Sequence, residues 1–485
     1  MGIIINQSFK NMVTTYIGFG IGAVNTLFLF TYFLEKEYYG LVSYLLSAAN
    51  LIWPFLVFGV HSTLIKFFTS YKTRGDQDRL LNFALITPAI AGLIIGVFGL
   101  LFYNYLLEYF KGENDLVQPF IWLIFLIAMA TSYFEVFFSW SKIYYKSAFG
   151  NLMKEVFHRL CISILLFGVY FRWISVEFFI YGISAVFVIR TILMAMYAFS
   201  LHRPKFSFKF PKNIAPVVKY SSLILLAASV ATVLLDLDKV MIEHYLPIEN
   251  VAIYGIAVYI ATVISVPQKA MHQITNPLTA EMLNKKDRSG LKELYEKSSL
   301  NLLIISGLIF IWIITNVNSL YELIPEEYSV SILVVLLISL VKLYDNFLGN
   351  NNSILFNSDY YRIVLGVGVI LVIVAFVLNL YFIPQFGVEG AAIASFIAFA
   401  AYNTSKIFIV FKKFRIHPFT SKSWLTMILV IAFSLGFYFL NFPLHPFLNI
   451  TLKSILAGVL YLGIIYSFRF SEDINQMIDR FLKRS

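Results

Sequence analysis

The sequence predicts an all-α integral membrane protein with about fourteen transmembrane helices. Three observations support this fold class. The chain of 485 residues is 59% hydrophobic and 13% charged, whereas a soluble domain carries about 25% charged residues. It contains successive apolar runs of about 20 residues, the length that a helix needs to cross the hydrocarbon core. Its Lys and Arg residues gather in alternate connections between these runs, as the positive-inside rule requires.

The apolar runs define the expected spans in order. Gly, Pro and Asn inside a run do not exclude a span, because neighbouring helices can satisfy the backbone groups that these residues leave free. The close pairs within 150–201 and 361–412 are the hardest to divide. We expect spans at 11–34, 40–65, 80–103, 118–140, 150–170, 175–201, 216–246, 250–275, 297–317, 328–350, 361–382, 389–412, 422–441 and 448–468.

The distribution of positive charge gives the orientation. Most of the 37 Lys and Arg residues, with Lys154 and Lys406 counted among them, fall on the side of the N-terminus and the even-numbered connections. This asymmetry places both termini in the cytoplasm. It also accounts for the net charge of +10 without a nucleic-acid partner. The opposite connections keep Lys36, Lys111, Arg172 and Lys453.

Two cytoplasmic stretches are longer than the others, 202–215 and 279–297. The second has charges at helical spacing, which fits a helix lying on the membrane surface or, more simply, a solvated connector. Neither stretch is long enough to hold a soluble domain.

An internal repeat divides the chain. One ungapped shift places Glu37 on Glu249, Asn114 and Asp115 on Glu326 and Glu327, and Val176 and Glu177 on Val388 and Glu389. These matches fall in corresponding outer connections of two halves with six spans each, so both halves keep one orientation. We expect an N-terminal six-helix lobe at 1–201, a C-terminal six-helix lobe at 213–415, and a transmembrane hairpin with a cytoplasmic tail at 416–485.

The chain lacks the motifs of nucleotide hydrolysis, metalloproteases and serine hydrolases. Cys161 is the only cysteine, which excludes an intrachain disulfide. Gly18, Gly20 and Gly22 fit close helix packing in a membrane better than a nucleotide loop, because no strand precedes them. The scattered histidines His61, His158 and His272 lie near cytoplasmic ends of spans, where a solvated or capping role is expected. We therefore predict no enzyme activity, no cofactor and no metal site.

Charged residues inside spans cost ~2.5–3.5 kcal/mol each on insertion scales and are therefore candidates for function. The charged residues inside the predicted spans include Asp345 on the tenth span and Glu243 near the outer end of the seventh span. The basic candidates, for substrate binding, are Arg159, Arg190, Lys239, Lys269 and Lys342, and the acidic candidates, for ion coupling, are Glu135, Asp236, Asp238 and Asp345.

Local pairing is the alternative to function for several of these charges. Asp236, Lys239 and Glu243 share one helical face, from which Asp238 points away. Lys342 and Asp345 are three residues apart and could neutralise each other.

Arg159 and Arg190 differ from these pairs, because we expect neither arginine to have an acid within one turn of its own helix. For Arg159, the best candidate partner is Glu135 on the preceding span. Lys269 lies near the cytoplasmic end of its span and could extend to the interface.

Three segments resemble the polysaccharide-biosynthesis flippases, the Wzx-type O-antigen and exopolysaccharide transporters of the MOP superfamily. They are YFLEKEYYGLVSYLLSAANLI at 32–52, DKVMIEHYLPIENVAIYGIAVYI at 238–260 and FGVEGAAIASFIAF at 386–399. The resemblance implies two lobes around a central cavity, alternating access, and an isoprenoid-diphosphate-linked oligosaccharide moved from the inner to the outer leaflet. It implies a prokaryotic plasma (inner) membrane location, with membrane lipid, Na⁺ or H⁺ and glycan polymerase machinery as further partners. A cationic cavity would offset the desolvation of the diphosphate.

Three alternatives stay open. A peptidoglycan lipid-precursor flippase also has fourteen spans. A MATE-type cation-coupled drug antiporter is less favoured, because residues 11–34 contain none of the acids typical of some drug exporters. A membrane glycan polymerase or ligase is disfavoured by the short outer connections.

Overall fold

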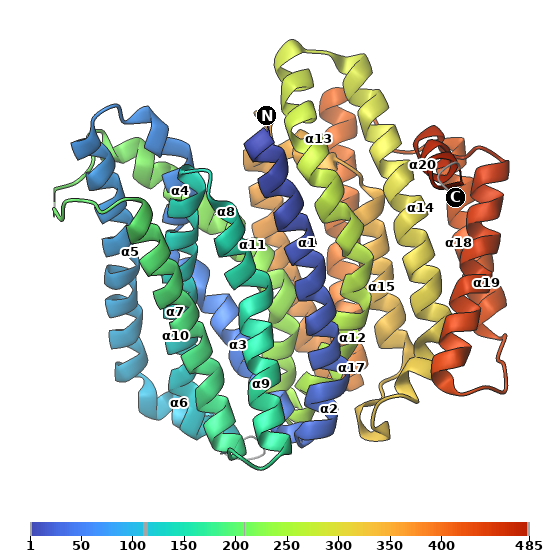
Figure 1. The fold of residues 1–485 in the computed structure, drawn as a ribbon, viewed down its shortest axis with the longest axis horizontal. Helices are drawn as coiled ribbons and strands as arrows, with labels where there is room; N and C mark the ends of the chain where they lie inside the picture. Colours follow the sequence, from blue (N-terminus) through green and yellow to red (C-terminus); the bar gives the residue numbers. More distant parts are fainter. Residues whose placement is uncertain (1, 110–114, 208, 483–485) are drawn as a thin grey trace. The chain divides into compact units, whose positions relative to one another are not determined.

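The computed structural model describes residues 2–109, 115–207 and 209–482, which form helices joined by short turns and contain no strand (Figure 1). The predicted fold class, an all-α membrane protein, is confirmed. Lys111 and Asn114, which entered the sequence argument, lie outside the described residues, as do Lys483 and Arg484.

The chain divides into two compact units, Met1–Ala252 and Ile253–Ser485. The lobes predicted at 1–201 and 213–415 rest on the internal repeat and stay a prediction. The first unit contains α1 (Gly2–Val24), η1 (Asn25–Leu29), α2 (Phe30–Phe33), α3 (Lys36–Val57), α4 (Val60–Phe67), η2 (Phe68–Ser70), α5 (Arg74–Leu101), α6 (Tyr103–Tyr109), η3 (Asp115–Phe120), α7 (Ile121–Ile143), α8 (Ser147–Leu152), η4 (Met153–Phe157), α9 (His158–Tyr170), α10 (Val176–Leu201) and α11 (Ile214–Tyr245).

The helix α12 (Glu249–Thr262) crosses the boundary between the units. The second unit continues with η5 (Val263–Ser265), α13 (Val266–Lys285), α14 (Arg288–Tyr321), η6 (Glu326–Tyr328), α15 (Ile332–Phe347), α16 (Asn351–Phe356), α17 (Tyr361–Phe414), α18 (Ser421–Tyr438), α19 (Pro446–Ser467) and α20 (Glu472–Leu482).

Within the described ranges, ten helices are long and apolar enough to cross a membrane, or eleven if the bent helix α11 counts as one span. Each predicted span coincides with a helix or with consecutive helical segments. The other predicted spans correspond to the α8–η4–α9 stretch, which π-helical geometry interrupts, to α15, which has 16 residues, and to the second half of α17. The protein therefore crosses the membrane several times, and the count of fourteen stays a prediction.

Backbone geometry explains why α17 contains two predicted spans. Gly387 has φ 58° and ψ −135°, which breaks the helix between 361–382 and 389–412. A residue with a Cβ reaches this region only with strain, so glycine fits here. The difficult pair is thus two helices joined at one glycine.

The stretch 279–297 contains an exposed connection, as one of its two predictions has it, but no separate surface helix. The helix α13 continues to Lys285, and Lys286 reverses the chain with φ 56°. Asp287 then caps α14 by accepting a hydrogen bond from the Gly290 backbone N–H at 2.9 Å. The stretch therefore consists of the ends of two long helices and an exposed tight turn between them, and it forms no separate surface helix.

The predicted orientation can be tested by cysteine labelling in a Cys161→Ser background. Glu326 and Lys286 are both exposed and lie in connections predicted on opposite sides. Glu326→Cys should react with an impermeant maleimide added to intact cells, and Lys286→Cys should react only after permeabilisation. The reverse pattern would exclude the predicted orientation.

Candidate functional site

The first unit gathers charged side chains from α4, α7, η4, α9 and α10, and we name this group the unit-1 charge cluster. Its members act on one another electrostatically at the depth of the spans. In Figure 1, α7 and α10, which carry part of this cluster, run side by side. The cluster consists of His61, Glu135, Lys142, Lys154, Glu155, His158, Arg159 and Arg190.

The tightest contact in the cluster is an ion pair between Glu135 on α7 and Lys154 on η4. Lys154 Nζ donates to Glu135 Oε1 at 2.6 Å, and Glu135 is only 7% exposed. The predicted pair between Glu135 and Arg159 is therefore wrong. Lys154 counts among the cytoplasmic charges in the orientation predicted from the sequence, although it lies inside the predicted span 150–170. A lysine at this position in an apolar span indicates a charge inside the membrane, which could have identified Lys154 as a partner for Glu135.

Arg159 instead contacts an acid on its own helical stretch. Its Nη2 lies 3.8 Å from Glu155 Oε2, one turn earlier, so the expectation that no such acid exists is wrong for this arginine. Nη1 of Arg159 is buried without a hydrogen-bond partner among the described residues. Glu155 is part of the π-helical turn η4, a geometry that is frequent at functional sites.

Arg190 on α10 is 4% exposed, and its guanidinium lies between two aromatic rings. The centroids of Phe134 and Phe187 are 4.3 and 4.6 Å from its Cζ. Such stacking stabilises a desolvated cation by about 2 kcal/mol or more. Its Nε is buried without a hydrogen-bond partner among the described residues, so the rings do not saturate its donors.

The cluster carries an excess of positive charge. Four cationic side chains surround two carboxylates. Nδ1 of His61 is also buried without a hydrogen-bond partner within the described ranges, whereas His158 makes a hydrogen bond with the Met153 backbone. Both residues are partly exposed, so the solvated or capping role expected for them stays a prediction. Buried donors without acceptors are costly, and an anion with several oxygens satisfies them. The cations are Lys142, Lys154, Arg159 and Arg190.

A second polar site joins α3 and α11. Asp236 accepts hydrogen bonds from Ser47 Oγ at 2.9 Å and from Asn50 Nδ2 at 3.2 Å, and Lys239 Nζ lies 3.5 Å from its Oδ1. The predicted pairing of Asp236 with Lys239 is confirmed. Asp238 and Glu243 on the same helix are buried.

A third site lies in the second unit. Asp345 on α15 pairs with Lys406 on α17 at 3.4 Å and accepts a hydrogen bond from Gln268 Nε2 at 3.2 Å. Lys342, the partner expected from the sequence, also acts on Asp345 electrostatically. The orientation predicted from the sequence places Lys406 in a cytoplasmic loop, yet its side chain is only 2% exposed. Its position inside the predicted span 389–412 could have identified it as a charge inside the membrane.

The remaining sequence candidates are Lys342, which lies near the Asp345 site, and Lys269. Lys342 Nζ lies 5.8 Å from the centroid of the Phe399 ring. Lys269 is exposed on α13. The structure thus joins Glu135, Arg159 and Arg190 in one cluster and leaves Lys269 on a surface.

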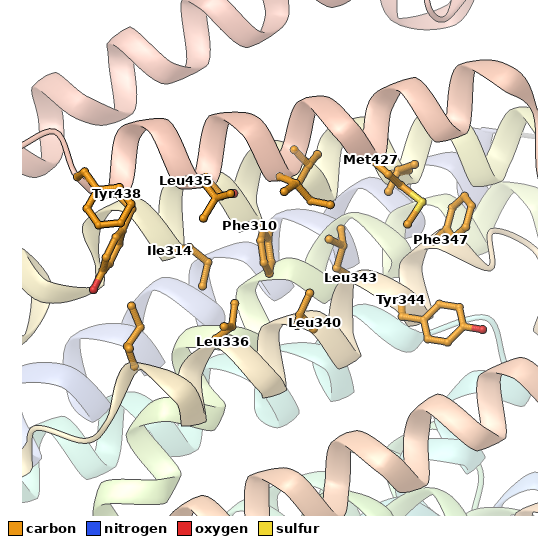
Figure 2. A pocket seen from close by; sticks show the side chains of 16 residues that line it. Phe310, Ile314, Leu336, Leu340, Leu343, Tyr344, Phe347, Met427, Leu435 and Tyr438 are labelled. Atoms are coloured by element: carbon orange, nitrogen blue, oxygen red, sulfur yellow. The ribbon is translucent and has the colours of Figure 1, made fainter.

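The second unit also contains an apolar cavity of about 480 Å³ between α14, α15 and α18. Figure 2 shows that Phe310 and Ile314, Leu336 and Leu340, and Leu435 line it from these three helices. Its polar lining atoms are few. A space of this kind at membrane depth suits a hydrocarbon chain better than a polar ligand.

The chain is similar to known proteins in both sequence and fold. The model of the polysaccharide biosynthesis protein family matches residues 5–283, which is more than half of the chain. An uncharacterized membrane protein of Methanocaldococcus jannaschii is 23% identical, and the match covers 92% of each chain.

Two solved structures share the fold. The lipid II flippase MurJ in an inward closed conformation has a TM-score of 0.71 at 14% identity and covers 95% of this chain and 99% of its own. An inward-facing multidrug resistance MATE family transporter of the MOP superfamily has a TM-score of 0.56 at 14% identity, with 90% and 96% covered. The fold is therefore that of these transporters.

Helix packing beside the cluster can be tested at Gly18 on α1. A Cβ at Gly18 would collide with the backbone carbonyl of Glu155, whereas a Cβ at Gly20 meets no atom within 4 Å. Gly18→Ala should therefore destabilise the protein by about 1–3 kcal/mol. Gly20→Ala should leave stability unchanged or raise it by up to about 1 kcal/mol. The thermal midpoints of the purified variants measure this difference, and equal midpoints would contradict the close helix contact.

Proposed function

Because the chain belongs to the polysaccharide biosynthesis protein family, we propose that it is a flippase that moves an isoprenoid-diphosphate-linked oligosaccharide from the inner to the outer leaflet. It is a transporter and not an enzyme. The proposal includes a prokaryotic plasma membrane with both termini in the cytoplasm. It also includes alternating access by the two repeat-related lobes, 1–201 and 213–415, and a possible link to glycan polymerase machinery.

The excess positive charge of the unit-1 charge cluster is the observation that carries the proposal. A diphosphate brings negative charge and several acceptor oxygens, which the unpartnered donors of Arg159 and Arg190 can satisfy. The side chain of Lys154 is 43% exposed although it lies within a predicted span. A charged side chain exposed to lipid at this depth costs ~2.5–3.5 kcal/mol on insertion scales, so we place the exposed part of Lys154, whose Nζ pairs with Glu135, beside a water-filled path for the cargo.

The apolar cavity in the second unit suits the other part of such a cargo. A polyisoprenoid chain presents hydrocarbon only, and the cavity is lined by side chains such as Phe310, Leu336 and Leu435. A purely polar or cationic drug would find no matching partner there. This favours a lipid-linked cargo over the cargo of a drug antiporter.

A peptidoglycan lipid precursor is the second candidate, because the MurJ fold is similar over nearly the whole chain. Both cargoes carry a lipid-linked anionic head, so the charge cluster fits either one. Flux measured in proteoliposomes with each defined lipid-linked glycan separates them. The faster cargo identifies the substrate class.

For energy coupling we propose Na⁺ or H⁺ binding at Asp236, with Asp238 as a further carboxylate. Ser47 and Asn50 bring neutral oxygen-bearing side chains to Asp236, and its lysine contact, with Lys239 at 3.5 Å, comes from its own helix. Glu135 is less suited, since Lys154 holds it at 2.6 Å.

Arg190 gives the first test. Arg190→Ala should lower flux of the lipid-linked glycan at least tenfold, because it removes one charge from the cluster, and Arg190→Lys should restore part of it. Flux into proteoliposomes is compared with Lys146→Ala, which removes an exposed cation. The thermal midpoint separates lost binding from lost folding. Normal flux in a stable Arg190→Ala protein would exclude this role.

Asp236 gives the second test. Asp236→Asn keeps a similar shape and removes the charge that would bind a cation, so flux should no longer respond to an imposed Na⁺ or H⁺ gradient. Glu327→Gln, an exposed carboxylate in an outer connection, is the matched control. Full gradient dependence in both Asp236→Asn and Asp238→Asn would exclude these carboxylates as the coupling site.

A further inference from the structure

Lys406 is held in the second unit by a ligand set suited to a bound cation. Its Nζ lies 3.4 Å from Asp345 Oδ1 and 3.1 Å from Asn352 Oδ1. The ring of Tyr402 covers it at 4.6 Å from the centroid. A carboxylate oxygen, an amide oxygen and an aromatic face are all groups that attract a monovalent cation.

The site is fixed by neighbouring helices. Gln268 on α13 donates to both Asp345 Oδ2 and the Asp345 backbone carbonyl at 3.2 Å. This orients the carboxylate, so that Oδ1 is directed to Lys406. Lys406 itself is 2% exposed, whereas the Asp345 side chain is 29% exposed. The carboxylate can therefore be reached from outside, while the ammonium fills the inner part of the site.

A carboxylate in the first unit, Asp236, is compensated differently. Asp236 receives neutral donors from Ser47 and Asn50, and its lysine contact, to Lys239, comes from its own helix. Lys406 comes from a different helix than Asp345 and has a second oxygen ligand in Asn352. The two sites therefore differ in the ligands and the burial of the lysine, because Lys406 has the additional oxygen of Asn352 and is the more buried of the two.

We propose that the Asp345 site is a monovalent-cation site whose permanent occupant is the ammonium of Lys406. The lysine supplies a built-in counter-ion, and an external ion binds there only when the lysine is removed. The proposal deepens the proposed function, on whose ion coupling it rests, by assigning the exchangeable ion to Asp236 and a fixed cation to Asp345.

The test measures cation binding rather than transport, so that its failure is separate from failure of the flippase proposal. All variants carry Asp236→Asn, which removes the other cation site. Lys406→Met, of similar length without charge, should create a Na⁺ site. Its thermal midpoint should rise by about 2 °C or more in sodium chloride over choline chloride at equal ionic strength. Alkaline pH keeps Asp345 ionised. Binding of radioactive sodium to the purified protein should increase in parallel.

Three controls accompany this variant. Lys406→Arg keeps a tethered cation, and Lys412→Met removes an exposed lysine from the same helix. Both should show no difference between the two salts. Asp345→Asn combined with Lys406→Met removes both charges and should abolish the sodium effect.

Each outcome decides the proposal. Sodium-dependent stability in Lys406→Met that disappears with Asp345→Asn supports it, and so does a Lys406→Met protein that accumulates only when sodium is present throughout purification. Equal behaviour of Lys406→Met in both salts, whether it is stable or unstable, overturns the proposal. A sodium effect that survives Asp345→Asn also overturns it.

Discussion

A charge inside a low-dielectric, water-poor region needs a partner, and this constraint shapes both units of the protein. Glu135 and Asp345 are the acids within the fourth and tenth predicted spans, and each pairs with a lysine. Removing one partner of such a pair is most costly where the charge that is left unpaired is buried, as Glu135 and Lys406 are. The positions of the surrounding helices therefore depend on these pairs.

The two units satisfy the constraint with lysines from different helices. The shift that places Glu37 on Glu249 also places Arg190 on Tyr402, one turn before Lys406. In the second unit, the cation on that helix neutralises the acid. In the first unit, Lys154 takes this role from η4, and Arg190 is left to stack on aromatic rings. The excess positive charge of the unit-1 charge cluster follows from this exchange of partners.

The helices were predictable from sequence, whereas the partners were not. A run of about 20 apolar residues is a property of the chain alone, so each expected span has a helix in the structure. Ion pairs depend on helix rotation, which the sequence does not give. The π-helical turn η4 inserts one residue into its helix and thereby changes the direction of Lys154 and Glu155. This is why the Glu135–Arg159 pair was predicted wrongly and the Asp236–Lys239 pair, within one regular helix, correctly.

The way each carboxylate is compensated indicates which site can change occupancy during transport. An ion exchanges only where its removal leaves the carboxylate with other hydrogen-bond donors. Ser47 and Asn50 meet that condition at Asp236. At Asp345 the compensating cation is the ammonium of Lys406, which is covalently attached to the protein and only 2% exposed. Separating it from Asp345 would leave this buried ammonium unpaired. We therefore infer a division of roles, in which the first unit binds exchangeable ions and anionic cargo. The second unit keeps its charge fixed and offers an apolar cavity for hydrocarbon.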